Sequence, residues 1–279
     1  MKTQQIYDTP QGQEILLQKY DEILSAWPLP LEKREINTSF GRAFVLAWGN
    51  PHNTPLVLLH GSMSNSSMWI GEAVEYAKHF RLYAIDIPGE PGHSDPVRLD
   101  LRSPEPGLWL DQVLNGLHIS STNLAGISMG GFFALRYASA FPEKIKKLVL
   151  LCPAGVTSQR LSFLWKAIKF IVLGMKGTEA TTRLVFGNTN VPEETIAYTR
   201  LISSHFTPVL AIPNIPDKIL TKVKTPTLLI AGDKDVLLDS KKTINRLTKL
   251  LTDFQPVLLP GIGHVIIDQS QRVITFLQE

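Results

Sequence analysis

Five short apolar runs that end in or beside glycine constrain the fold of this 279-residue chain more than any other feature. The runs read PLVLLHG, RLYAIDIPG, KKLVLLCPAG and TPTLLIAGD, with STNLAG as a weaker fifth. Continuous apolar runs of this length suit strands that are buried on both faces, as in a parallel sheet. Helix-like stretches separate them, namely WIGEAVEYAKH, EPGLWLDQVLNGL, GGFFALRYASAF and SKKTINRLTKLL. This alternation predicts βαβ units and an α/β fold with a doubly wound, mostly parallel sheet.

A separate N-terminal unit precedes this pattern. Apolar residues fall on one helical face over residues 10–26, and Pro28 and Pro30 end the helical spacing. LEKREINTS and GRAFVLAWGN then alternate like the two strands of a hairpin around Phe40 and Gly41. We therefore expect a helical extension over residues 1–30, ahead of a core that begins at residue 31.

One region breaks the strand–helix alternation. Residues 155–222 contain no convincing buried-strand run and are rich in apolar residues at helical spacing, including Trp165 and Phe206. We expect this segment to form a helical cap inserted between two parts of the core, residues 31–154 and 223–279. Sites in open α/β sheets lie outside the carboxyl ends of the strands, so a cap emerging there would cover the site.

Composition argues against several classes of protein. The 28 lysines and arginines are scattered and the formal net charge is only +3, which does not favour a nucleic-acid-binding surface. Cys152 is the single cysteine, so no intrachain disulfide can form, and its apolar context indicates a buried thiol. The N-terminus is too polar for a signal peptide, and no apolar stretch reaches the ~18 residues of a membrane span. We expect a soluble, cytoplasmic protein that binds neither nucleic acid nor membrane.

The stretch AGISMGG carries the strongest chemical signal. Gly126 to Gly130 fits G-x-S-x-G, and it lies between a predicted strand and a predicted helix, which is the context the pattern requires. Glycines on both sides of Ser128 allow strand and helix to approach closely at a tight, strained turn. Ser128 would then stand at a helix N-terminus, where N–H groups favour negative charge. We predict that Ser128 is a nucleophile.

A serine hydroxyl needs a base, and seven histidines are candidates. Four have positions that do not suit a catalytic base. His52 lies in a polar turn, His79 late in a predicted helix, His118 after a predicted helix and His205 in the predicted cap. His93 is held in reserve because it lies in a loop after a strand. His264 follows a short strand in a glycine loop, LLPGIGHVIID, downstream of the other motifs. We predict that His264 is the general base.

The acid that orients the histidine should lie between Ser128 and His264, after a strand. TPTLLIAGDKDVLLD offers Asp233, Asp235 and Asp239. Asp233 adjoins the glycine that ends the strand and is suited to capping the turn. We predict Asp235 as the acid that holds the imidazole in its useful tautomer, with Asp233 as the alternate.

An oxyanion hole requires two N–H donors aimed at the developing charge. The N–H of Met129, directly after the nucleophile, is one candidate. The loop after another strand, LLHGSMSNSSMW, supplies the N–H of Ser62 as the second. For the substrate pocket we predict four side chains, those of Met63, His60, Trp165 and Phe206.

Taken together, these motifs resemble the α/β-hydrolase superfamily, in its capped esterase-like branch. The resemblance extends from about Glu32 to Glu279: His60-Gly61 resembles the oxyanion loop, GISMGG the nucleophile elbow, GDKD the acid loop and GIGH the histidine loop. DIPGEPGHS resembles the family loop D-x-P-G-x-G-x-S but carries one residue more, which leaves the directions of His93 and Ser94 open.

The resemblance implies a serine hydrolase that cleaves esters of small or medium acyl or aromatic substrates through an acyl-enzyme. Serine at the elbow argues against the epoxide hydrolases and haloalkane dehalogenases, which use aspartate there. Thioesterases, lactonases, carbon–carbon bond hydrolases and perhydrolases remain alternatives, as do triad-bearing lyases and signalling receptors. No metal or organic cofactor is expected, because no cysteine–histidine cluster has ligand spacing. The partner is a small-molecule ester, and the oligomeric state stays open.

Overall fold

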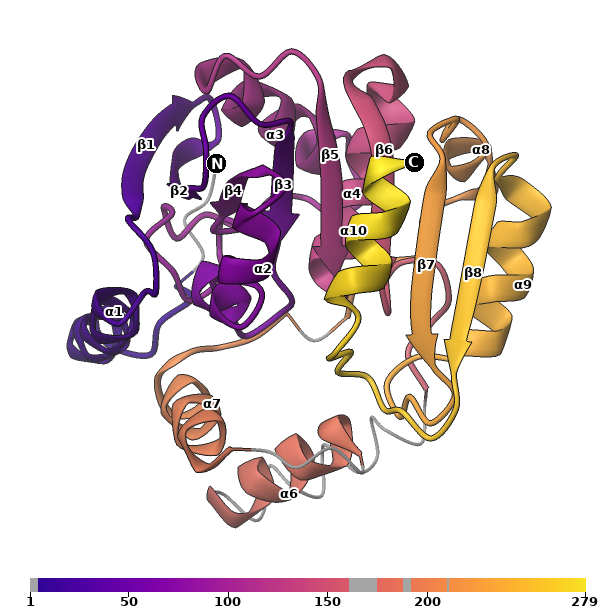
Figure 1. The fold of residues 1–279 in the computed structure, drawn as a ribbon. Helices are drawn as coiled ribbons and strands as arrows, with labels where there is room; N and C mark the ends of the chain where they lie inside the picture. Colours follow the sequence, from indigo (N-terminus) through magenta and orange to yellow (C-terminus); the bar gives the residue numbers. More distant parts are fainter. Residues whose placement is uncertain (1–4, 161–174, 188–191, 210) are drawn as a thin grey trace.

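A computed structural model describes residues 5–160, 175–187, 192–209 and 211–279. One eight-stranded sheet runs through it in the order β1-β2-β4-β3-β5-β6-β7-β8 (Figure 1). The strands are β1 (Glu32–Thr38), β2 (Gly41–Trp48), β3 (Pro55–Leu59), β4 (Arg81–Ile85), β5 (Thr122–Ile127), β6 (Ile145–Leu151), β7 (Thr227–Gly232) and β8 (Phe254–Leu259). Strand β2 pairs antiparallel with β1 and β4, and all other neighbours are parallel. The predicted doubly wound, mostly parallel sheet is confirmed.

The central strands are buried on both faces, as their continuous apolar sequences predict. Every residue of β4 and β7 is buried, because helices cover both faces of the sheet. The edge strand β1 is instead partly exposed and begins with Glu32, Lys33 and Arg34. Charges of this kind discourage edge-to-edge pairing with another sheet.

The core helices follow the predicted alternation with one difference. The described helices are α1 (Pro10–Ser25), α2 (Ala73–Ala77), α3 (Glu105–Gly116), α4 (Met129–Ala140), α6 (Met175–Phe186), α7 (Glu193–His205), α8 (Asp217–Leu220), α9 (Ser240–Leu250) and α10 (Ser270–Gln278). The stretch WIGEAVEYAKH does not form one helix. A 3-10 helix (Ser66–Ile70) and the short α2 divide it, with Gly71 between them.

Helices α6 and α7 lie between β6 and β7 in the chain and beyond the carboxyl ends of the strands in space (Figure 1). They belong to the segment 155–222 predicted as a cap, which we call the cap segment. The boundaries at residues 155 and 222 stay a prediction. Within the described part of the chain, no helix has the length and hydropathy needed to cross a membrane.

The N-terminal helix packs on its own chain and links the core to the cap segment. Tyr20 and Leu24 of α1 join the main hydrophobic core. Leu16, on the same helix, belongs to a second cluster that also contains Ile202 of α7 and Phe206. An antiparallel bridge between Tyr7 and Phe206 extends this connection. The N-terminal segment, whose packing partner the sequence leaves open, therefore contacts both the core of the sheet and helix α7.

Candidate active site

The predicted nucleophile stands on a sharp turn between β5 and α4. Ser128 has φ 51° and ψ −109°, a backbone conformation that is strained for any residue with a Cβ. Its N–H donates to Leu151 O (2.9 Å), and its own carbonyl accepts from Ala154 N–H (2.9 Å). Ser128 is the N-cap residue of α4, so its side chain stands at the positive end of that helix dipole.

Two glycines make this turn possible because no side chain fits at their positions. A Cβ at Gly126 would lie 2.4 Å from Gly130 O, and a Cβ at Gly130 would lie 2.2 Å from Leu59 O. Both separations are far below van der Waals contact. The glycine positions of the motif are therefore required by close backbone packing between β3, β5 and α4.

The predicted acid and base form a buried pair at the neighbouring strand ends. His264 Nδ1 lies 2.7 Å from Asp235 Oδ2, and both side chains are almost fully enclosed. Asp235 Oδ1 also accepts hydrogen bonds from Leu237 N–H (2.8 Å) and Leu238 N–H (3.0 Å), which fix the carboxylate in place. Asp233 instead accepts from Gly261 N–H (2.7 Å) and caps the turn that leads to His264.

The electrostatics of the pair favour a negative carboxylate beside a histidine that readily takes a proton. Burial alone would raise the pKa of Asp235, but the charge and hydrogen bond of His264 and two backbone N–H groups lower it. Burial alone would lower the pKa of His264, but the charge and hydrogen bond of Asp235 and the nearby Cys152 thiol raise it. An imidazolium formed by proton transfer is therefore stabilised at this position.

Cys152 is buried close to the acid–base pair. Ser128 is hydrogen-bonded to Leu151, which precedes Cys152, and to Ala154, two residues after it. The Cys152 sulfur lies within 4.8 Å of ligand atoms of Asp235 and His264. Among the described hydrogen bonds none joins Ser128 Oγ to His264, and such bonds are often long before substrate binds. Cys152, Asp235 and His264 are also donors of types that bind metals, although Asp235 and His264 already satisfy each other.

The two predicted oxyanion donors belong to segments that adjoin the nucleophile. Met129 is the first residue of α4, where backbone N–H groups have no acceptor within the helix. In the second segment, a Cβ at Gly61 would lie 3.7 Å from Ser128 Cβ, which places the loop after β3 beside the serine. Ser62 follows Gly61 directly in this loop, and its role as the second oxyanion donor stays a prediction.

The His60 side chain is hydrogen-bonded to backbone atoms and does not line a pocket in this structure. Its side chain is fully buried, and Ile87 N–H donates to Nε2 (2.8 Å). Nδ1 therefore carries the proton and donates to Gly61 O (2.8 Å). Burial lowers the pKa of His60, with opposing contributions from Asp86 and Gly61 O, so the neutral ring fits both hydrogen bonds.

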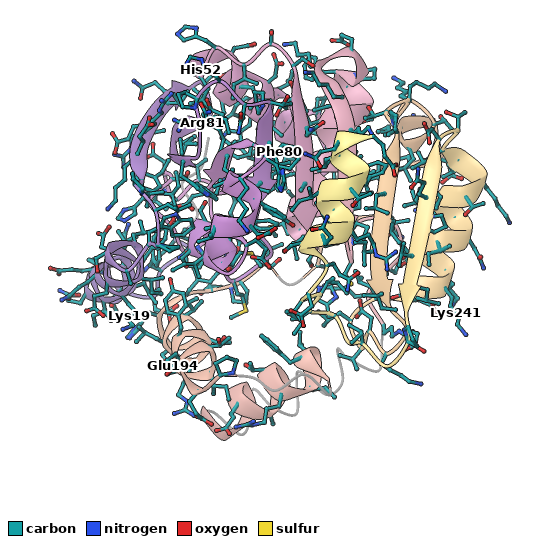
Figure 2. The ribbon with its side chains drawn as sticks, viewed as in Figure 1. Lys19, His52, Phe80, Arg81, Glu194 and Lys241 are labelled. Carbon is teal, nitrogen blue, oxygen red and sulfur yellow. The ribbon has the colours of Figure 1, made fainter. Side chains whose placement is uncertain are left out.

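Two of the other histidines, His93 and His52, have contacts or positions elsewhere in the molecule. His93, held in reserve by the sequence, stacks on Tyr20 and approaches Asp21 Oδ1 at 3.2 Å, so it packs against α1. His52 lies at the end of the sheet opposite the cap helices (Figure 2). The extra residue in DIPGEPGHS does not expose Ser94, whose hydroxyl donates to Asp86 O (2.6 Å) and accepts from Phe44 N–H (2.8 Å).

A cavity of about 500 Å³ lies beside the elbow. Apolar side chains dominate its lining, and the residues that matter here are Ile87, Leu99, Met129, Phe133 and Val209, together with the charged Glu90 and Arg98. Three of the four predicted pocket residues are described by the structure, and none of them, Met63, His60 or Phe206, is among the residues that line this cavity. Phe206 is buried against Tyr7 in the second cluster, with the cavity-lining Thr207 next to it, and Met63 packs on the edge of the same cluster. Trp165 lies outside the described residues.

Two features of the site were missed by the sequence reasoning. Glu90 is buried and accepts a hydrogen bond of 2.6 Å from Met63 N–H. Asn65 Nδ2 donates to Tyr198 OH of cap helix α7 (2.7 Å) and to Pro91 O (2.8 Å). The extra residue in DIPGEPGHS was the available signal for Glu90, whereas no local pattern marks a contact between positions 65 and 198.

Comparison with known proteins gives relatives over nearly the whole chain. The family described as the alpha/beta hydrolase fold matches residues 54–190. The uncharacterized carboxylesterase nap of Bacillus subtilis is 27% identical over 276 residues, covering 94% of this chain and 89% of the relative. Carboxylesterase YbfK of the same organism is 25% identical over 276 residues, covering 93% and 92%.

Solved structures agree with this assignment. The carboxylesterase CesB (YbfK) of Bacillus subtilis superposes with a TM-score of 0.85 at 23% identity, covering 96% of this chain and 98% of the other. The naproxen esterase of Bacillus subtilis gives a TM-score of 0.79 at 25% identity, covering 93% and 96%. With the strand order and the structural comparisons in agreement, the chain has the α/β-hydrolase fold.

Proposed function

We propose that this protein is a serine hydrolase that cleaves carboxylic esters through an acyl-enzyme intermediate. The observation that carries the proposal is the buried pair of His264 and Asp235, joined at 2.7 Å, which follows strands of the same sheet as the serine on its strained elbow. Relatives that cover most of the chain are named carboxylesterases, which supports esters as the substrate class.

Each residue has a defined role in this mechanism. Ser128 Oγ attacks the ester carbonyl while His264 Nε2 takes its proton, and Asp235 stabilises the imidazolium that results. The N–H groups of Met129 and Ser62 bind the oxyanion of the tetrahedral intermediate. The carbon–oxygen bond to the alcohol then breaks, and His264 returns its proton to the departing alcohol. Water attacks the acyl-enzyme by the same route, which releases the acid and restores Ser128.

The cavity beside Met129 supports a small or medium acyl or aromatic substrate. At about 500 Å³ it is within the usual range for small-molecule sites, and its lining is mainly apolar. Because Met129 both lines this cavity and carries a proposed oxyanion donor, a group bound there would be adjacent to the reacting carbonyl.

The test is a series of p-nitrophenyl esters of increasing acyl length, assayed with wild type and Ser128→Ala. We expect turnover by wild type and a loss of roughly 10³- to 10⁶-fold in Ser128→Ala. Ser120→Ala, which changes an exposed serine before β5, is the matched control and should retain full activity. Equal rates for wild type and Ser128→Ala would refute the proposal.

Two further measurements separate this function from the alternatives that the superfamily offers. Labelling of Ser128 by a fluorophosphonate without turnover of any ester or thioester would instead favour a binding or signalling protein. Hydrolysis in ¹⁸O-labelled water should place one labelled oxygen in the acid product. A product without that oxygen would indicate a lyase.

A further inference from the structure

The loop after β4 brings a buried carboxyl group against the loop that carries the proposed oxyanion donor Ser62. Glu90 is only 2% exposed, and its Oε2 accepts a hydrogen bond of 2.6 Å from Met63 N–H. The Glu90 backbone is fixed as well, since its N–H donates to Ile87 O (3.2 Å) and its carbonyl accepts from Gly92 N–H (2.8 Å). This is the loop that is one residue longer than the superfamily pattern, and Glu90 lies in the lengthened part.

The partner of Glu90 has a strained backbone. Met63 has φ 55°, in the left-handed region that costs a residue with a Cβ roughly 1 kcal/mol or more. Such a conformation persists only when its surroundings hold it, and the described hydrogen bond of Met63 N–H is the one to Glu90. Because Ser62 immediately precedes Met63, a change in the Met63 backbone would turn the peptide that carries Ser62.

We propose that Glu90 is a positioning residue whose side-chain carbonyl oxygen holds Met63 N–H and thereby keeps the Ser62 N–H aimed at the oxyanion. The proposal rests on the serine-hydrolase function proposed above. Glu90 does not touch the reacting atoms; it acts through the backbone of the oxyanion loop.

The surroundings indicate that Glu90 acts as a neutral acid. Burial raises the pKa of Glu90 to about 8, while the Met63 N–H hydrogen bond and the charge of Arg98 oppose this rise. Tyr7, from the N-terminal segment, also faces Glu90, but it is a neutral phenol because burial and the nearby Asp86 raise its pKa well above 10. In the neutral form one oxygen of Glu90 accepts from Met63, and no negative charge opposes the nearby oxyanion.

A pH dependence follows from this arrangement. As pH rises through the pKa of Glu90, near 8, a buried negative charge develops beside the loop that must stabilise the tetrahedral oxyanion. The rate of acylation should therefore fall on the alkaline side. An amide keeps the carbonyl acceptor but cannot ionise, so Glu90→Gln should keep the pH 7 rate and lose the alkaline fall.

The experiment measures kcat and KM for p-nitrophenyl butyrate from pH 6 to 10, with the Ser128→Ala background subtracted. Glu90→Gln should stay within about threefold of wild type at pH 7 and show no decline near pH 8. Glu90→Ala should lower kcat by roughly 10- to 100-fold, less than deletion of an oxyanion donor, with KM nearly unchanged. A boronic acid that mimics the tetrahedral intermediate should lose affinity in parallel with kcat.

Glu72→Gln is the matched control. Glu72, at the start of α2, is another largely enclosed carboxyl group whose pKa burial raises, but no described contact joins it to the oxyanion loop. It should keep the alkaline decline of wild type. The proposal is overturned if Glu90→Gln retains that decline, if Glu72→Gln removes it, or if Glu90→Ala changes KM alone.

A measurement that needs no turnover separates this proposal from the proposed function. The Met63 amide resonance in ¹⁵N-labelled protein should shift with a midpoint near pH 8 in wild type and stay constant in Glu90→Gln. If no ester is hydrolysed, the proposed function fails, while this titration still decides whether Glu90 controls the loop. A Met63 amide that does not titrate overturns the proposal, even if Glu90→Ala fails to fold.

Discussion

Asp235 accepts through both carboxylate oxygens, one from His264 Nδ1 at 2.7 Å and the other from the backbone N–H groups of Leu237 and Leu238. The carboxylate is thus fixed before it orients the ring. Asp235→Asn should lower kcat by roughly 10⁴-fold on a p-nitrophenyl ester, because an amide can favour the wrong tautomer of His264. Steady-state kinetics with a folding check by circular dichroism would measure this.

The neighbouring Asp233 provides the control for this prediction. Its carboxylate caps Gly261 N–H at 2.7 Å, and an asparagine oxygen can accept the same hydrogen bond. Asp233→Asn should therefore retain activity within about tenfold. A larger loss in Asp233→Asn than in Asp235→Asn would reverse the roles assigned to the two carboxylates.

The elbow glycines lead to a prediction about stability. A Cβ at Gly130 would lie 2.2 Å from Leu59 O, whereas a Cβ at Gly71 would meet nothing within 4 Å. Gly130→Ala should cost more than about 3 kcal/mol in the free energy of unfolding, since backbone atoms of β3 must move. Gly71→Ala should change it by less than about 1 kcal/mol. Urea unfolding of both variants would measure the difference, and similar midpoints would contradict the packing argument.

The sheet could be predicted from sequence because each central strand is buried on both faces. The runs LYAI and LLIA are apolar at every position, so both faces of each strand need an apolar environment. Consecutive residues are enough to show this. The acid–base pair could be predicted for a related reason. Asp235 and His264 each follow a strand of one parallel sheet, and the carboxyl ends of such strands share an edge.

Other features depend on contacts between distant residues and could not be read from local patterns. His60 looked like a pocket residue because it follows a strand, but the Ile87 N–H that satisfies Nε2 lies 27 positions away. Likewise, the apolar character of Phe206 indicated burial but not against which partner, and the structure places it against Tyr7 of the N-terminal segment. Composition reveals that such a side chain is buried, not which surface it covers.

The contact between α7 and the loop after β3, which carries a proposed oxyanion donor, leads to a prediction about substrate binding. Tyr198 OH accepts from Asn65 Nδ2 at 2.7 Å and so connects α7 to the loop after β3. Tyr198→Phe removes this hydrogen bond and should raise KM a few-fold with little change in kcat, since a single such bond contributes about 1 kcal/mol. Asn65→Ala also loses the bond to Pro91 O and should be the more damaging change. Identical KM values for wild type and Tyr198→Phe would contradict this coupling.

The buried Glu90 carboxyl group should make the stability of the protein depend on pH. Its folded-state pKa is about 8 against an ordinary value of 4.5, so between these values the folded chain retains a proton that the unfolded chain releases. Glu90 makes its full contribution to the free energy of unfolding below about pH 4.5. This contribution declines as pH rises and changes no further above about pH 8. The full loss is on the order of 3 to 5 kcal/mol, because one pKa unit corresponds to about 1.4 kcal/mol.

Glu90→Gln cannot ionise, so its unfolding free energy should lack this decline and exceed that of wild type increasingly from pH 5 to pH 9. Glu194→Gln, which changes an exposed residue of α7 (Figure 2), is the control, because its side chain remains in water on folding. Urea unfolding of the three proteins at pH 5, 7 and 9 would measure this difference in unfolding free energy, because these pH values span the pKa of Glu90. If Glu90→Gln and wild type lost stability in parallel over this range, Glu90 would have to be ionised in the folded protein, and a neutral acid beneath the oxyanion loop would be ruled out.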